Sequence, residues 1–161
     1  MGGSKPMPTA AVEGLTQGER LLLWSFRAWV SGPGHRPMVL REFGRVFPAD
    51  EAGPAIRALE RSIAAIAGHA RREIQHHPVC AQQVAPDEQA VMALFAALQE
   101  ERVDIAIRHA SWLVRPSGIT PVVTAAAALA FAMIENDLEL PYRPISQSFE
   151  AGTSALLELR S

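Results

Sequence analysis

The chain has 161 residues, of which 48% are hydrophobic and 20% charged, and its formal net charge at pH 7 is −2. A chain of this length can bury about 70% of the surface that its unfolded form exposes, so one domain with one core is expected. The small net charge disfavours broad binding to nucleic acid or to a membrane, because such binding needs many uncompensated basic side chains. Cys80 is the single cysteine, which excludes an intramolecular disulfide and favours a cytoplasmic protein.

The two ends of the chain differ in composition from its middle. Residues 1–14 lack both the basic start and the apolar core of a secretion signal, and they are predicted to form a flexible leader. Residues 15–140 carry the helical patterns and form the predicted domain. Residues 141–161 begin with two prolines that predict an extended path, and Ala155–Leu159 is compatible either with a short docking helix or with a loose tail.

Two helices are predicted near the start of the domain. Thr16 and Glu19 have the S/T-x-x-E spacing of a capping box, so the first helix begins there, and it ends before Ser31. Pro37 suits the first position of a second helix, which stops before Pro48. The first helix is apolar on most of its faces, and its Trp side chains are predicted to be part of the core: Trp24 and Trp29.

A third helix is predicted to be capped by Asp50 or Gly53, with Pro54 in its first turn and a stop near Gly68. Helical periodicity is then lost. The segment between Arg72 and Val84 is compatible with a minor two-stranded β-ribbon that turns near Pro78.

The second half of the domain predicts three further helices. A fourth opens at Pro86, and a fifth runs from about Arg102 to Val114. In the sixth, Val122–Ile134 is an uncharged run of 13 residues, shorter than the roughly 18 that span a bilayer. We therefore expect an all-α, single-domain bundle of about six helices with this run dry at its centre, and we expect no membrane association.

The best candidate for a metal or redox site is formed by His76, His77 and Cys80. The His77-x-x-Cys80 spacing fits half of a zinc site, but zinc sites usually repeat such a pair, and the chain has no second cysteine. Loop histidines beside a buried or partly buried thiol are therefore the favoured interpretation. Motifs for a nucleophile elbow, a P-loop or a dinucleotide fold are absent from the sequence, so no cofactor is predicted and a non-enzymatic protein is favoured.

The order of the predicted elements allows a second hypothesis. Three helices, a ribbon and a long helix occur in this order in winged helix-turn-helix DNA-binding domains. In that arrangement Arg57 and Arg61 would face DNA, and Arg71 and Arg72 would lie on the wing. Seven Arg against five acidic residues between positions 36 and 80 is a surplus of only two, and element order is an analogy of fold alone.

The remaining hypothesis is a regulatory protein that acts through contacts with another protein or with its own copy as a homodimer. Trp, Tyr and Arg dominate binding energy where they become desolvated, so the predicted interface residues are Trp112, Tyr142 and Arg143. For Trp112 the core is an equally good interpretation. The sequence does not identify the partner or any small-molecule ligand.

Overall fold

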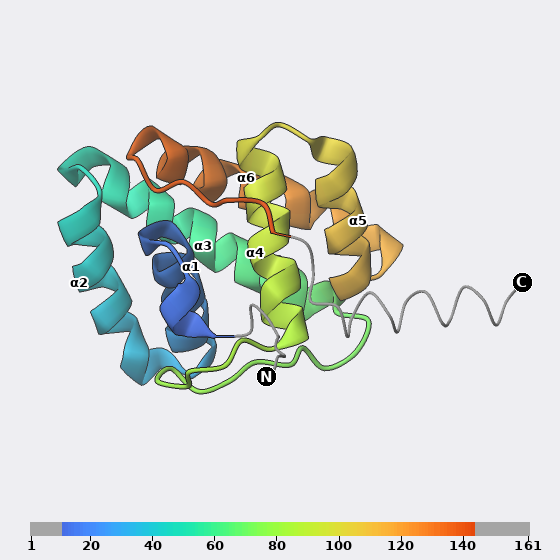
Figure 1. The fold of residues 1–161 in the computed structure, drawn as a ribbon, viewed down its shortest axis with the longest axis horizontal. Helices are drawn as coiled ribbons and strands as arrows, with labels where there is room; N and C mark the ends of the chain where they lie inside the picture. The colour runs from blue at the N-terminus through green and yellow to red at the C-terminus, as the bar shows by residue number, and fades with distance from the viewer. Residues whose placement is uncertain (1–10, 144–161) are drawn as a thin grey trace, which may run out of the picture.

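The computed structural model describes residues 11–143, in which six α-helices pack around one core (Figure 1). In chain order the helices are α1 (Gln17–Val30), α2 (Arg36–Val46), α3 (Ala49–His69), α4 (Pro86–Gln99), α5 (Val103–Leu113) and α6 (Ile119–Glu135). Three single-turn 3-10 helices lie between them or before them: η1 (Val12–Gly14), η2 (Pro33–His35) and η3 (Pro116–Gly118). The predicted all-α bundle is confirmed.

The ends of α1 follow the signals read from the sequence. The Thr16 hydroxyl accepts a hydrogen bond from the Glu19 amide at 3.2 Å, and the Glu19 carboxylate accepts one from the Thr16 amide at 2.8 Å. This capping box satisfies amides that a first helical turn leaves free. After Ser31 the chain turns at Gly32, whose φ of 123° is a conformation that other residues rarely adopt.

Helix α3 begins earlier than predicted. Its first residue is Ala49, and neither Asp50 nor Gly53 caps it, so that prediction was wrong. The carbonyl of Pro48 instead accepts the first amides of the helix, with its closest hydrogen bond at 2.8 Å from the Glu51 nitrogen. Pro54 consequently lies inside α3 rather than in its first turn.

The most deeply buried helix is α4, and the expectation that the sixth helix would occupy the centre was wrong. Helix α4 packs against α1, α5 and α6, and every residue from Ala90 to Leu98 is buried. Figure 1 shows α4 crossing the middle of the bundle. A helix with neighbours on several sides cannot leave one face wet, which explains why this stretch contains no charged residue.

Helix α6 is buried on one face only. Val122, Ala126, Leu129 and Met133 face the interior, whereas the Phe131 side chain is 42% exposed. The stretch Pro116–Glu135 is long and apolar enough to cross a membrane, with a mean hydropathy of 1.8, but composition alone also describes core helices of soluble proteins. Its inner stripe packs on α3 and α4, as expected for a helix that forms one side of a bundle.

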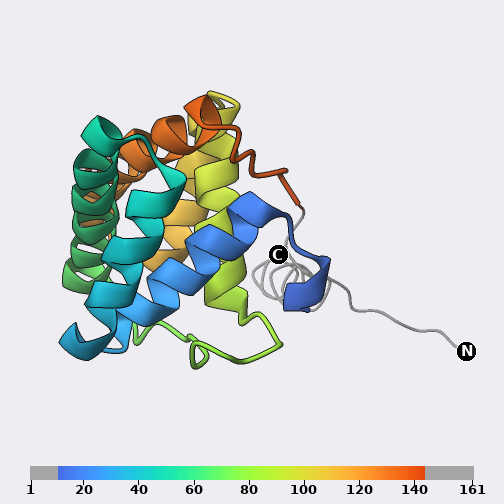
Figure 2. The same cartoon turned by 90° about the vertical axis from the view of Figure 1, so that its left-hand side faces the viewer.

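No β-ribbon forms between Arg72 and Val84, and the described residues contain no strand, so that prediction was wrong. The chain from Ala70 to Ala85 is an irregular loop that runs along the lower edge of the molecule in Figures 1 and 2. Its polar backbone groups bond to buried side chains instead of to a second strand, as described below.

After α6 the chain runs without regular structure across the start of α1. The Gln99 side chain holds this segment: it accepts a hydrogen bond from the Leu140 amide at 2.7 Å and donates one to the Leu138 carbonyl at 3.0 Å. Gly18 permits the close approach, since an added Cβ would lie 2.8 Å from the Glu139 carbonyl oxygen. The first ten residues of the predicted leader and the predicted helix Ala155–Leu159 lie outside the described residues.

Candidate binding groove

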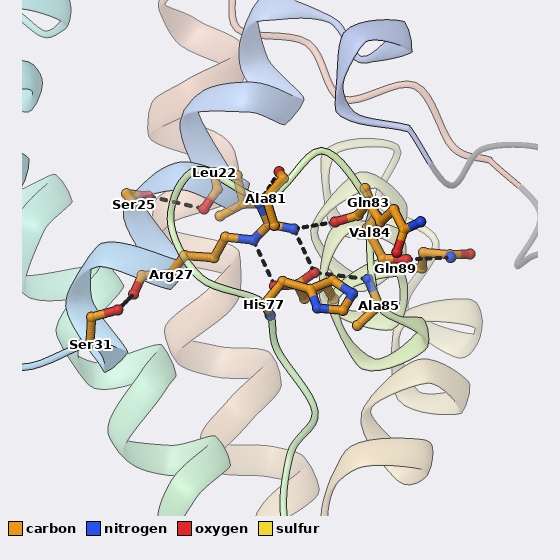
Figure 3. Close-up of polar contacts among 11 residues, drawn as sticks. Leu22, Ser25, Arg27, Ser31, His77, Ala81, Gln83, Val84, Ala85 and Gln89 are labelled. Carbon is orange, nitrogen blue, oxygen red and sulfur yellow. Dashed lines mark hydrogen bonds and ion pairs between the residues drawn. The ribbon is translucent and has the colours of Figure 1, made fainter.

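A buried ion pair joins α1 to α4 and to the loop before α4. The Arg27 guanidinium donates two hydrogen bonds to the Glu88 carboxylate, at 2.8 and 2.9 Å, and both side chains are almost wholly buried. Figure 3 shows that the same guanidinium also reaches the loop carbonyls of Ala81, at 2.9 Å, and Gln83, at 2.6 Å. Its charge is thus compensated by four acceptor contacts in a place that excludes water.

Glu88 also binds the backbone of the loop from the other side. Its carboxylate accepts hydrogen bonds from the amides of His77, at 3.0 Å, and Ala85, at 2.8 Å. The second bond is the reciprocal half of a capping box at the start of α4. Because side chains satisfy these backbone groups, the loop needs no ladder of strand hydrogen bonds.

Asp87 anchors the first part of the loop. Its carboxylate accepts two hydrogen bonds from Arg72, at 2.7 and 2.9 Å, one from the Gln75 amide at 2.7 Å and one from the Trp112 indole at 2.9 Å. Burial disfavours the charge of Asp87, but the hydrogen bonds from Arg72, Gln75 and Trp112 outweigh burial and hold the pKa of this carboxyl below its usual value. Arg72 also lies over the Trp112 ring, 4.8 Å from its centroid.

The segment after α6 is attached by two further polar contacts. Arg143 donates hydrogen bonds to the buried Glu19 carboxylate at 2.7 and 3.0 Å. The Tyr142 hydroxyl lies 2.8 Å from His109 Nε2 on α5. Burial lowers the pKa of His109, and the nearby charge of Arg108 lowers it further, so the neutral imidazole is favoured.

Several residues singled out from the sequence therefore make contacts inside the molecule. The three interface candidates, Trp112, Tyr142 and Arg143, bond to Asp87, His109 and Glu19 as described above. Arg71, expected on a wing, donates to the carbonyls of Ser111 and Val114 at 2.7 and 3.1 Å, which ties the loop to the end of α5.

The other two DNA-binding candidates, Arg57 and Arg61, are exposed on α3. The same helix carries three acidic residues, Asp50, Glu51 and Glu60, so its charge is not positive. With the ribbon also missing from the described chain, the winged-helix analogy loses the element that would contact the DNA backbone.

The predicted metal or redox residues do not form a cluster. His76 and Cys80 are exposed and His77 is half-buried. Within residues 11–143, no group of three His, Cys, Asp or Glu side chains is placed to hold a metal ion. The expectation of a buried or partly buried thiol was wrong, because Cys80 is exposed in the loop before α4.

The feature best suited to bind another molecule is a groove of about 610 Å³ between α1, α2 and the segment after α6, here called the α1–α2 groove. Figure 2 shows α1 and α2 side by side at this face of the bundle. Its apolar lining residues are Leu15, Leu21, Trp24, Val46 and Leu138, and its polar ones are Gln17, Arg20, Glu42 and Arg45. Clefts of this size with an apolar floor and a few polar groups are typical of binding sites.

The charged rim of the groove combines two arginines with one carboxylate. Arg45 donates a hydrogen bond to Glu42 on the preceding turn of α2, with 3.3 Å between Arg45 Nε and Glu42 Oε1, and this contact raises the pKa of Arg45. Arg20 donates to the Glu13 carbonyl at 2.9 Å. Since a carbonyl carries no charge, the rim retains one uncompensated positive charge.

No pattern in the sequence marks this groove. Trp24 was assigned to the core together with Trp29, which is indeed buried, whereas Trp24 is only half-buried and lines the groove. A helix whose apolar residues cover most of its surface does not reveal which of them a neighbouring helix fails to cover.

Comparison of the chain with protein-family models, with curated proteins and with solved structures finds no match. The fold and the groove define a small all-α bundle with a candidate binding surface.

Proposed function

We propose that this chain is a non-enzymatic, cytoplasmic binding protein that recognises an amphipathic helical segment of a partner protein in the α1–α2 groove. The observation that carries the proposal is the combination of a half-buried Trp24 on an apolar floor with a positively charged rim. An amphipathic helix that lies in such a groove buries its apolar stripe against the floor and keeps its polar side at the rim.

The charges of the rim indicate the chemistry of the partner. Among residues 11–143, Arg20 hydrogen-bonds to the uncharged carbonyl of Glu13, whereas Arg45 is paired with the Glu42 carboxylate. An acidic side chain beside the apolar stripe of the partner would pair with Arg20, and guanidinium–carboxylate pairs add geometric specificity. The expected partner segment therefore carries apolar residues at i, i+3 and i+7 with Asp or Glu next to them.

A display selection tests this proposal even though the partner protein is unidentified. The full chain is immobilised, and a library of random peptides of helical length is panned against it and against an Arg20→Glu variant. We expect enriched peptides to be acidic and amphipathic, and to bind the Arg20→Glu variant at least about tenfold more weakly in fluorescence polarisation, a loss of about 1.4 kcal/mol that is reasonable for one charge-assisted contact.

The matched control is Arg61→Glu, which makes the same charge change on an exposed part of α3. This variant should bind the enriched peptides as the unchanged chain does. Failure to enrich any peptide, or equal loss of binding in both variants, would contradict the proposal.

Self-association is a separate proposal that is supported by exposed apolar side chains outside the groove. Val103 and Ile107 lie one turn apart on α5, and Phe131 is exposed on α6. Light scattering at several concentrations should show a homodimer whose fraction falls on dilution. A monomer at every concentration would exclude this proposal.

A further inference from the structure

We infer that residues 144–161 of the same chain occupy the α1–α2 groove in the absence of a partner, so that the tail regulates access to the groove. This inference deepens the proposed function and rests on it. It names one occupant, a segment of this chain outside the described residues, and three observations support it.

The first observation is where the described chain ends. Arg143 is bound to Glu19 and to the Gly14 carbonyl at the start of α1, and Leu15 in the following turn lines the groove. Leu138, five residues before Arg143, also lines it. The following 18 residues span at most about 60 Å when extended, so they can reach back along the whole of the groove.

The second observation is the chemistry of the tail. Leu156 and Leu159 are three residues apart, and Phe149 precedes Leu156 by seven, which is the spacing of one helical stripe. Glu150 and Glu158 provide acidic groups beside this stripe. The tail thus combines an apolar stripe with neighbouring acidic residues, as we expect of a segment that binds the apolar floor and the arginines of the groove.

The third observation is charge. Residues 144–161 contain two acidic residues and one Arg, whereas the rim contains two Arg and one Glu, so the two surfaces have opposite net charges. The first ten residues of the chain are the other segment outside the described part. They contain one Lys and no acidic residue, so their charge has the same sign as that of the rim.

Attachment to the same chain makes even a weak tail effective. Two groups joined by a short stretch of one chain meet at an effective concentration in the millimolar range, so a tail with millimolar intrinsic affinity would fill about half of the grooves. A partner then binds with an apparent Kd raised by the inverse of the fraction of open grooves. Removal of the tail's apolar stripe should therefore strengthen the binding of an amphipathic peptide by twofold or more.

The inference is tested with a nitroxide label on the tail of the full chain. Because Cys80 is exposed and would itself react with the label, it is first replaced by Ser. A Ser161→Cys substitution then provides the attachment point on the tail. In ¹⁵N-labelled protein the nitroxide should broaden amide signals of Gln17 and Val46 and the indole signal of Trp24. A Leu156→Asp, Leu159→Asp variant should lose this broadening, whereas the matched Thr153→Asp, Ser154→Asp variant adds two charges outside the stripe and should retain at least part of it.

Three outcomes would overturn the inference. Broadening could fall on another face of the bundle or on no amide of the described residues, or it could survive Leu156→Asp, Leu159→Asp. Broadening could also appear when ¹⁵N protein without a nitroxide is mixed with ¹⁴N protein that carries one. The tail would then bind to a second copy of the chain. Failure of the proposed function is distinguishable, because then the display selection fails on both the unchanged chain and the Leu156→Asp, Leu159→Asp variant, whatever the label shows.

Discussion

Replacement of Glu88 by Gln tests whether the buried ion pair holds the bundle and its loop together. Glu88 and Arg27 are each about 1% exposed, and the pair is surrounded by α1, α4 and the loop. Removal of one partner from a buried pair leaves the other charge uncompensated and costs about 3–5 kcal/mol. Small domains unfold at a cost of only about 5–15 kcal/mol, so the loss is a large fraction of the total.

The loss of unfolding free energy in each variant follows from the hydrogen bonds that the substitution removes. Glu88→Gln keeps one oxygen, which can accept from only one of the two loop amides, because the His77 amide bonds to Oε2 and the Ala85 amide to Oε1. Arg27 keeps the carbonyls of Ala81 and Gln83, so a cost of about 3–5 kcal/mol is expected. Arg27→Met leaves the carboxylate charged and removes the donors to both carbonyls, so about 4–5 kcal/mol is expected. The double variant carries neither charge and should lose clearly less than the sum of the single losses.

Urea unfolding of the unchanged protein, the two single variants and the double variant measures the free energies of unfolding. Hydrogen exchange of the His77 and Ala85 amides reports on the loop directly. The exposed pair of Glu42 and Arg45 is the matched control, and Arg45→Met should leave the free energy of unfolding nearly unchanged, because water screens exposed ion pairs. If each buried single variant costs no more than this control, or if the double loss equals the sum, the pair does not hold α1, α4 and the loop together.

Three further predictions concern stability. Gly18→Ala should destabilise by about 1–3 kcal/mol because its Cβ meets a backbone carbonyl at 2.8 Å, whereas Gly44→Ala meets no atom within 4 Å and should stabilise by about 0.5–1 kcal/mol in urea unfolding; equal signs would refute the packing argument. Burial lowers the pKa of His109, so as the pH falls the unfolded chain takes up this proton before the folded chain does. The contribution of His109 to the free energy of unfolding should be constant above about pH 6.5 and fall below that pH, by at most about 1.4 kcal/mol per pH unit. A His109→Gln variant with the same slope would contradict this. Leu129→Ala should cost about 2–5 kcal/mol and Phe131→Ala less than about 1 kcal/mol in thermal or urea unfolding, and similar losses would mean that α6 is not buried on one face only.

The positions of the helices could be predicted because their signals are local. Thr16 and Glu19 form the expected capping box, and the prolines at positions 37 and 86 lie in the first turns of α2 and α4. These effects act between neighbours in the sequence, so they do not depend on how the helices later pack. The start of α3 escaped prediction because the cap is a backbone carbonyl, that of Pro48, which no side-chain signal marks.

The site could not be predicted to the same extent. Arg27 carries no mark in the sequence that separates it from the other 13 arginines, yet its own side chain is buried and its guanidinium meets a buried carboxylate 61 residues away. The same long-range pairing replaces the expected ribbon by an irregular loop. Trp24 lines a groove whose other walls come from α2 and from the segment after α6, and no property of α1 alone contains that information.

By itself the sequence determined that residues 11–143 form six helices with a common core, since helix caps, prolines and apolar periodicity depend on residues close together in the sequence. The tertiary structure alone decided that α4 rather than α6 lies at the centre, which charges pair, and where the groove opens. Burial and electrostatic pairing are properties of surfaces brought together from distant parts of the chain, and the free energy of each depends on what covers it.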